Sequence, residues 1–206
     1  MIGIVGGVGS GKSSLVAALA GLHLQIIDAD QLGHQQLLRP HVRTALIDHF
    51  GPQILADSGE IHRPALAALV FGDSAAQQAS RETLNQIVRP GIRREILQQL
   101  RNVPPQIDAV VLDAALLLEA GLDQLCDLLI FIDTPEQLRH QRTAATRGWS
   151  AEELHRRERS QWPLERKRAA CSHSIDNSGA FSSTVSQLQQ ILQHFLHHPK
   201  TSSPAP

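Results

Sequence analysis

MIGIVGGVGSGKSS, the stretch from Met1 to Ser14, decides the fold of this chain. Its apolar start, Ile2 to Val5, predicts a short buried strand, and Gly6 to Ser13 follow with the spacing G-x-x-x-x-G-K-[ST]. Glycines in such a loop let backbone N–H groups turn toward phosphate oxygens, and a helix beginning near Lys12 directs its positive end at the same place. The stretch therefore predicts a strand, a phosphate-binding loop and a helix in that order.

The loop predicts that the chain binds a nucleoside triphosphate with a magnesium ion. The ammonium group of Lys12 is expected to reach the β- and γ-phosphates, and the hydroxyl of Ser13 to ligate the metal. Good helix formers run from Ser13 to Ala20, and Gly21 supplies a stop. The loop residues expected to hold the nucleotide are Gly7, Val8, Gly9, Ser10, Gly11, Lys12, Ser13 and Ser14.

The composition is that of a folded globular protein. Of the 206 residues, 42% are hydrophobic and 19% are charged, which excludes a fibrous or wholly disordered chain. The longest apolar runs are far shorter than the roughly 20 residues that cross a bilayer, and glycines occupy the place where a signal peptide needs an apolar stretch. We therefore expect a cytoplasmic protein with no membrane partner, whose cysteines, Cys126 and Cys171, stay reduced.

The charge argues against nucleic acid as a partner and weakly in favour of polyphosphate. The formal net charge is −1, although the segment from His155 to Ala170 is locally cationic. Only three of the 19 basic residues are lysine, and the planar fork of arginine matches phosphate oxygens.

Carboxylates follow two further predicted strands. Leu24 to Ile27 leads into Asp28 and Asp30, and Ile107 to Leu112 leads into Asp113. Ligands of parallel α/β sheets bind beyond the carboxyl ends of the strands, so we expect these acids near the phosphates, with one accepting a proton from an attacking hydroxyl. Asp28 and Asp30 are expected on an extended segment, pointing the same way, and Asp30 also suits the N-cap of a helix starting near Gln31. Three roles are open for Asp113: it binds Mg²⁺ indirectly, it contacts the substrate, or it is a simple turn residue.

The rest of the chain predicts helices around this core. Some 75 residues separate the second and third strands, which indicates an inserted helical region for substrate. A fourth strand is followed from Pro135 by a helix with Arg139, Arg142 and Arg147, and a second helix starts at Ser150 with a capping box. These arginines indicate a lid over the polyphosphate, and the alternative is a solvated helical hairpin. The predicted helices outside the lid are Pro40 to Phe50, Pro64 to Phe71, Ser74 to Leu100 and Ser182 to Phe195.

Taken together, the chain resembles the dephospho-CoA kinases, from Ile2 to about Leu192. Beyond the loop, IDADQLG at Ile27 to Gly33 and GEIHRPALAALVF at Gly59 to Phe71 are similar to that family's segments. The remaining similar motifs are L-N-x-x-x-x-P-x-I from Leu84, L-L-x-E at Leu116 to Glu119, Q-x-P-x-x-x-K at Gln161 to Lys167, and N-x-G from Asn177.

The resemblance implies ATP-dependent phosphorylation of the ribose 3′-hydroxyl of dephospho-CoA, with ATP and Mg²⁺, by a monomer or small homo-oligomer. It implies an α/β P-loop NTPase fold of three layers with a central parallel five-stranded sheet. One domain, 1–206, would comprise a core at 1–33, 106–134 and 171–198, a helical CoA-side insertion at about 34–105 and a helical lid at about 135–170.

The resemblance also implies roles for individual residues. Asp30 would be the base, with Lys12 at the phosphates and Arg142 stabilising the transferred phosphoryl group, although Arg139 and Arg147 stay open as alternatives. Arg147 and Asn177 would contact the nucleotide, Asn177 beside the adenine. The residues implied for the acceptor side are Asp28, Asp30, Arg63, Leu84, Asn85, Arg89, Asp113 and Leu117.

The chain departs from the family pattern at three places outside the phosphate loop. It has Arg89 where the family usually has histidine, Ala115 where it has proline, and Cys171-Ser172 where it has Ala-Asp. Two alternatives therefore remain: a P-loop kinase for another small hydroxyl or phosphate acceptor, and a catalytically silent nucleotide-binding protein. The second leaves the intact Lys12, Ser13 and Asp30 unexplained.

Overall fold

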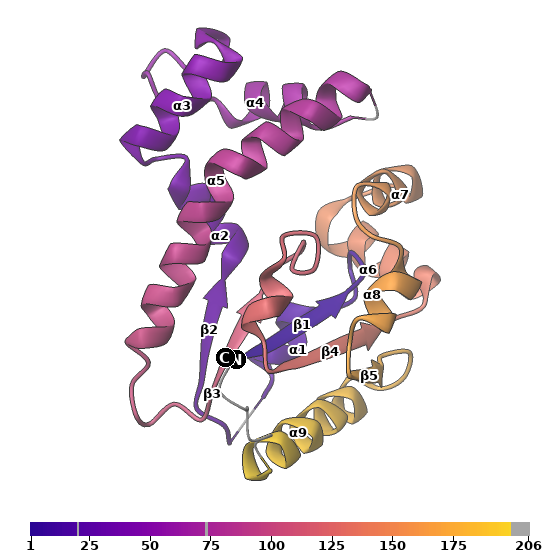
Figure 1. Cartoon of the computed structure of the whole chain (residues 1–206). Helices are drawn as coiled ribbons and strands as arrows, with labels where there is room; N and C mark the ends of the chain where they lie inside the picture. The colour runs from indigo at the N-terminus through magenta and orange to yellow at the C-terminus, as the bar shows by residue number, and fades with distance from the viewer. Residues whose placement is uncertain (20, 73, 199–206) are drawn as a thin grey trace. The chain divides into compact units, whose positions relative to one another are not determined.

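The computed structural model describes residues 1–19, 21–72 and 74–198, and the chain forms two compact units (Figure 1). The first unit comprises Met1–Ile27 and the chain from Val103 onward, and the second comprises Asp28–Asn102. In chain order the elements are β1 (Ile2–Gly6), α1 (Lys12–Ala17), β2 (Leu24–Asp28), α2 (Ala29–Gln36), α3 (Pro40–Phe50), η1 (Pro52–Ile54), α4 (Arg63–Val70), α5 (Ala75–Arg101), β3 (Ala109–Asp113), η2 (Leu122–Leu125), β4 (Leu128–Asp133), α6 (Glu136–Arg147), α7 (Ala151–Arg159), α8 (Leu164–Ala169), β5 (His173–Asp176) and α9 (Phe181–His197).

The first unit is built on a five-stranded parallel sheet with the order β2-β3-β1-β4-β5, as predicted. β1 lies at the centre and every one of its residues is buried. It pairs in parallel with β3 on one side, where Ile4 is opposite Asp113, and with β4 on the other, where Gly6 is opposite Ile132. A strand buried on both faces needs a continuous apolar sequence, which is why Ile2 to Val5 is decisive.

Alternate residues of the strands form a core with α1 and α9 on one face of the sheet. Ile2 and Ile4 of β1 join Ile130 and Ile132 of β4, and Leu188 and Leu192 of α9 pack against them without exposure to solvent. The period of two follows from the pleat of a strand. Figure 1 shows α9, in yellow, beside β5.

The opposite face of β1 carries a close approach that only glycine allows. A Cβ at Gly3 would lie 2.7 Å from Leu129 Cδ2 and 2.9 Å from Cys126 Sγ, so any side chain there displaces the packing. α8 packs against β1 as well, with Leu164 Cδ2 next to Gly7. The sheet of the first unit is thus covered by helices and loop segments on both faces.

The second unit consists of helices around its own apolar core. Val42, Leu46 and Phe50 lie one and two turns apart on α3, and they pack with residues of η1, α4 and α5. Pro40 is the first residue of α3, where its missing N–H costs nothing, and Gly51 takes a φ of +80° just after the helix ends. These signals made Pro40–Phe50 predictable to the residue.

Two sequence-based expectations about local structure are wrong. α1 ends at Ala17, because the N–H of Ala18 is shared with the carbonyl oxygen of Leu15 and that of Leu19 bonds to Val16, three residues back in each case. Ala20, the last residue of the predicted helix, lies outside the described residues. The acids Asp28 and Asp30 do not share an extended segment: β2 ends at Asp28, and α2 begins at Ala29.

Both cysteines are free thiols and both are expected to react slowly. Burial raises the pKa of Cys126 to about 12 and that of Cys171 to about 11. Since the thiolate is the nucleophile, about one thiol in a thousand or fewer is ionised at pH 8. We expect Ellman's reagent at pH 8 to modify the native protein far more slowly than the protein in guanidinium, and equal rates would contradict the burial.

Among the described residues, no helix is both long and apolar enough to cross a membrane.

Candidate functional site

The phosphate loop connects β1 to α1 and depends on glycine backbone conformations. Gly9 and Gly11 have φ of +74° and +86°, in the region that side chains disfavour. A Cβ at Gly9 would also lie 2.9 Å from the carbonyl oxygen of Arg139. The ammonium group of Lys12 donates to the carbonyl oxygens of Gly7 at 3.2 Å and Gly6 at 3.4 Å, so its charge lies over the loop.

One carbonyl oxygen in the loop, that of Ser10, accepts three side-chain hydrogen bonds. The amide of Asn177 donates to it at 2.8 Å, the hydroxyl of Thr134 at 3.1 Å and a guanidinium N–H of Arg142 at 3.3 Å. These donors come from the ends of β4 and β5 and from α6. A carbonyl oxygen would repel phosphate, so fixing it among these donors favours an anion-binding form of the loop.

Asn177 therefore has a role that the sequence did not indicate. Its side chain is 1% exposed. The amide nitrogen donates to the carbonyl oxygen of Ser10 and, at 3.3 Å, to the hydroxyl of Thr134. The side chain of Asn177 thus lies buried beneath the loop, held to the carbonyl oxygen of Ser10. The contact of Asn177 with the adenine stays a prediction.

The three arginines of α6 have different environments. Arg142 lies at the loop: its Nη1 would be 3.4 Å from a Cβ on Gly11, and its Nη2 donates to the carbonyl oxygen of Asn177 at 3.4 Å. Arg139 is 3% exposed, forms an ion pair with Glu158 of α7, and donates through Nε to the carbonyl oxygen of Thr134 at 3.1 Å. Burial lowers the pKa of the Arg139 guanidinium, while Glu136 acts in the opposite direction. Arg139 is therefore an internal support.

Arg147 lies at the end of α6 and stacks on an aromatic ring. Its guanidinium carbon is 4.6 Å from the ring centre of Trp149, and that of Arg157 is 4.0 Å from the same ring. Arg139 and Arg142 both lie next to the phosphate loop, since a Cβ on Gly7 would be 3.1 Å from Arg139 Nη1. Arg139 is paired with Glu158, whereas Arg142 donates only to the backbone carbonyl oxygens of Ser10 and Asn177 among the contacts described.

Ser13, in the first turn of α1, and Asp113, at the end of β3, lie within hydrogen-bonding distance of each other in the first unit. The hydroxyl of Ser13, in α1, donates to Asp113 Oδ2 at 2.6 Å, and Asp113 is the last residue of β3. β3 is the direct neighbour of β1, so the chain after each of these strands leaves the same edge of the sheet. Two motifs a hundred residues apart in sequence thus form one oxygen-rich pair.

Two further predicted motifs, L-L-x-E and Q-x-P-x-x-x-K, bind each other through a buried ion pair. Lys167 Nζ lies 3.0 Å from Glu119 Oε1 and donates to Gln161 Oε1 at 2.7 Å. The backbone N–H of Trp162 donates to the same Glu119 oxygen at 2.8 Å. The side chain of Lys167 is 2% exposed and that of Glu119 is 11% exposed. The pair ties the start of α8 to the segment after β3.

Leu117 belongs to the core. It is 2% exposed, and its Cδ1 would lie 3.0 Å from a Cβ on Gly3 of the central strand. The predicted substrate contact of Leu117 stays a prediction. Its neighbour Leu116 is 37% exposed.

The second unit carries the remaining predicted residues. Asp28, not Asp30, caps α2, since its Oδ1 accepts from the N–H of Gln31 at 2.8 Å. Asp30 is in the first turn of that helix. The helix cap that the sequence predicted at Asp30 is therefore formed by Asp28.

The other predicted residues of this unit lie on α4 and α5. Arg63, the first residue of α4, is within 2.8 Å of His34 Nε2 through its Nη2. Asn85 and Arg89 are partly exposed and four residues apart on α5, hence on one face of it. Leu84 is partly buried and packs against the apolar core of the unit, and its substrate contact stays a prediction.

The comparisons with known proteins agree on one family. The family model described as dephospho-CoA kinase matches residues 1–183. A dephospho-CoA kinase of Carboxydothermus hydrogenoformans is 37% identical over 94% of this chain and 93% of its own, and one of Enterococcus faecalis is 31% identical over 94% and 96%. A crystal structure of a Thermus thermophilus protein has a TM-score of 0.78 at 30% identity, covering 94% of this chain and 96% of the other.

Proposed function

Because the chain belongs to the dephospho-CoA kinase family, we propose that it transfers the γ-phosphoryl group of ATP to the ribose 3′-hydroxyl of dephospho-CoA. The products are ADP and CoA. The observation that carries the proposal is the convergence of Lys12, Arg142 and the Ser13–Asp113 pair on one phosphate loop. This arrangement supplies positive charge and a metal-binding pair where a triphosphate would lie.

The phosphate loop positions the triphosphate and neutralises its charge. Backbone N–H groups around Gly9 and Gly11 bind the phosphate oxygens, and the ammonium group of Lys12 binds the β- and γ-phosphates. Arg142 stabilises the negative charge that grows on the transferred group, since it already lies beside Gly11. Thr134 and Asn177 act through the loop by holding the carbonyl of Ser10 away from the anion.

The donor atoms of Ser13 and Asp113 fit a magnesium ion. Mg²⁺ prefers oxygen ligands and is usually bound by one or two carboxylates together with phosphates and water. Ser13 would ligate the ion directly and Asp113 would orient its water, and the ion would neutralise charge on the β- and γ-phosphates.

Asp30 accepts the proton of the attacking hydroxyl. It follows β2 by two residues, and ligands of parallel sheets bind beyond the carboxyl ends of the strands. The carboxylate takes the proton while the 3′-oxygen forms its bond to the γ-phosphorus and the bond to ADP breaks. Asp28 caps the helix and so fixes the turn from which Asp30 projects.

The second unit provides the acceptor side. Arg63, Asn85 and Arg89 lie on α4 and α5 of this unit, and we assign them to dephospho-CoA. An arginine at position 89 retains the ability to bind a phosphate of the acceptor, so the departure from histidine is compatible with the activity. We further propose that the enzyme acts in the cytoplasm as a monomer or small homo-oligomer, without nucleic acid.

The test of the proposed function is an ADP-release assay with purified protein and Mg-ATP. The acceptors are dephospho-CoA, adenosine, AMP, gluconate and none. We expect ADP release only with dephospho-CoA, at one ADP for each CoA detected by mass. ADP release with another acceptor would assign the chain to a different substrate, and ATP binding without turnover would indicate a silent nucleotide-binding protein.

Ser13→Ala is expected to raise the Mg²⁺ concentration needed for half-maximal activity by about tenfold or more, because it removes a ligand of the metal. The measurement is a magnesium titration of ADP release at fixed ATP. Ser182→Ala, at an exposed position of α9 outside the site, is the matched control, and a similar shift in both variants would contradict the assignment of the metal to Ser13.

A further inference from the structure

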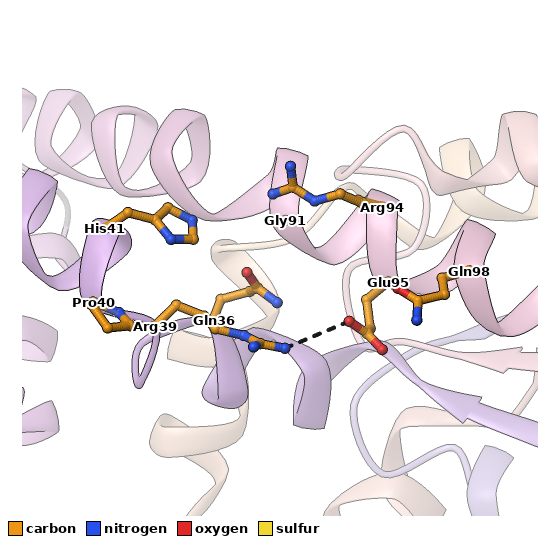
Figure 2. A pocket seen from close by; sticks show the side chains of 8 residues that line it. All are labelled: Gln36, Arg39, Pro40, His41, Gly91, Arg94, Glu95 and Gln98. Carbon is orange, nitrogen blue, oxygen red and sulfur yellow. Dashed lines mark ion pairs between the residues drawn. The ribbon is translucent and has the colours of Figure 1, made fainter.

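A cavity of about 400 Å³ lies entirely within the second unit, and nothing in the proposed reaction uses it. It lies among the end of α2, the start of α3 and one face of α5, as Figure 2 shows. The volume is that of an ordinary small-molecule site. The residues that matter for its chemistry are Gln36, Arg39, His41, Arg94, Glu95 and Gln98.

Gln36 presents an unpaired amide to this cavity. The residue is 4% exposed and lines the cavity, and among the described residues its amide has no hydrogen-bond partner. It reaches this position because α5 has a glycine there: a Cβ on Gly91 would lie 2.0 Å from Gln36 Oε1. Because Gln36 lines the cavity, a ligand there can accept from its Nε2 or donate to its Oε1.

The charges around the cavity favour an anion. Arg94 is exposed, and within the described part of the chain its guanidinium has no carboxylate partner. Arg39 faces Glu95 at 3.8 Å, a long distance for an ion pair (Figure 2). Arg39, Arg94 and Glu95 together carry a net charge of one positive, which an anionic ligand would neutralise.

The start of α3 adds backbone donors to the same wall. The first N–H groups of a helix have no partner inside it, and they carry the positive end of the helix dipole. The residue at the N-cap is Arg39, whose side chain makes no capping hydrogen bond. The N–H groups of His41 and Val42 are therefore available to a phosphate held by the two arginines.

The cavity is separate from the acceptor residues assigned above. Gly91, Arg94, Glu95 and Gln98 follow the three- and four-residue spacing of one face of α5. Arg89 is two residues before Gly91, which places it about 200° around the helix. Asn85 shares the face of Arg89, so the two faces of α5 serve different ligands.

We propose that this cavity is a binding site for a small organic phosphate monoester. Arg39, Arg94 and the N-terminal end of α3 hold the phosphate, and the uncharged part of the ligand lies against the amides of Gln36 and Gln98. The site needs neither the phosphate loop nor the kinase reaction, and its test is independent of both.

The test is an amide NMR titration of the ¹⁵N-labelled full chain at constant ionic strength. The probes are glycerol 3-phosphate and, separately, inorganic phosphate. We expect saturable shifts of the His41 and Val42 signals with both probes and a tighter dissociation constant for glycerol 3-phosphate. Signals of Gly9 and Gly11 report the phosphate loop in the same spectra and separate the two sites.

Arg94→Gln is expected to weaken binding at His41 and Val42 by about tenfold, since it removes a charged donor to the phosphate. Arg93→Gln is the matched control, because it removes the same charge from the next position of α5, which does not line the cavity. Arg39→Gln serves if the spectrum of the Arg94 variant shows a changed fold. Equal weakening in the Arg93 and Arg94 variants, absence of shifts at α3, or equal affinity for the two probes would each overturn the proposal.

Discussion

Asp30→Asn should lower kcat by about 10²–10⁴-fold while leaving the affinity for ATP within about twofold. The amide keeps the size of the side chain but cannot accept the proton of the attacking hydroxyl at neutral pH. A base acts in the chemical step, so its loss appears in kcat rather than in nucleotide binding. The measurements are steady-state ADP release with dephospho-CoA and calorimetric titration with a non-hydrolysable ATP analogue.

The matched control for this variant is Asp57→Asn. Asp57 is an exposed acid of the same unit, outside every helix and strand, so the same chemical change there should leave kcat unaltered. Unchanged turnover in Asp30→Asn would remove Asp30 from the role of base. A large loss of thermal stability in that variant would instead point to a structural role for Asp30.

Lys167→Met should destabilise the protein by about 3–5 kcal/mol, the usual cost of leaving one member of a buried ion pair alone. Lys167 is 2% exposed, and without it Glu119 keeps a buried carboxylate that only the N–H of Trp162 stabilises. The measurement is urea unfolding followed by circular dichroism, read as the change in the free energy of unfolding at constant m-value.

A second substitution tests the cause of that loss. Combining Lys167→Met with Glu119→Gln removes the stranded charge and retains an oxygen for Trp162, so we expect the double variant to recover much of the stability. A loss below about 1 kcal/mol in Lys167→Met would show that the pair behaves like an exposed one. A double variant no more stable than Lys167→Met would show that the loss comes from packing around position 167 instead.

The phosphate loop and the helix after it were predictable because their chemistry is local. The glycine spacing, Lys12 and Ser13 lie within eight consecutive residues, and Gly9 and Gly11 need positive φ for reasons that neighbouring residues do not alter. The start of α7 was predictable on the same grounds, since Ser150 accepts from the N–H of Glu153 at 3.2 Å. Local hydrogen bonding fixes such features before any tertiary contact forms.

The arginines of α6 could not be ranked from sequence. Arg139 and Arg142 are three residues apart on one helix, and the sequence around them does not distinguish them. In the structure, Arg139 is buried against Glu158, whereas Arg142 donates to the carbonyl oxygen of Ser10. What separates them is α7 and the loop after β5, which are distant in sequence. Spacing along one helix does not contain that information.

Asn177 and Leu117 illustrate the same limit at single residues. The resemblance implies a nucleotide contact for Asn177, but the sequence does not show that its amide donates to the carbonyl oxygen of Ser10, 167 residues earlier. A leucine in an apolar motif is equally suited to a substrate surface and to a core, and the bare backbone of Gly3 decides for the core. In both cases the deciding partner is a backbone atom of the N-terminal segment.

The most direct test of the proposed reaction is to identify its product, CoA phosphorylated at the ribose 3′-hydroxyl, by ³¹P NMR. After incubation of the purified protein with Mg-ATP and dephospho-CoA, we expect ADP and a new phosphomonoester resonance coupled to the ribose 3′-proton, in equal amounts. The signal should be absent with Asp30→Asn over the same time. A phosphomonoester on another hydroxyl, or ADP with no new monoester, would contradict transfer to the 3′-position by this chain.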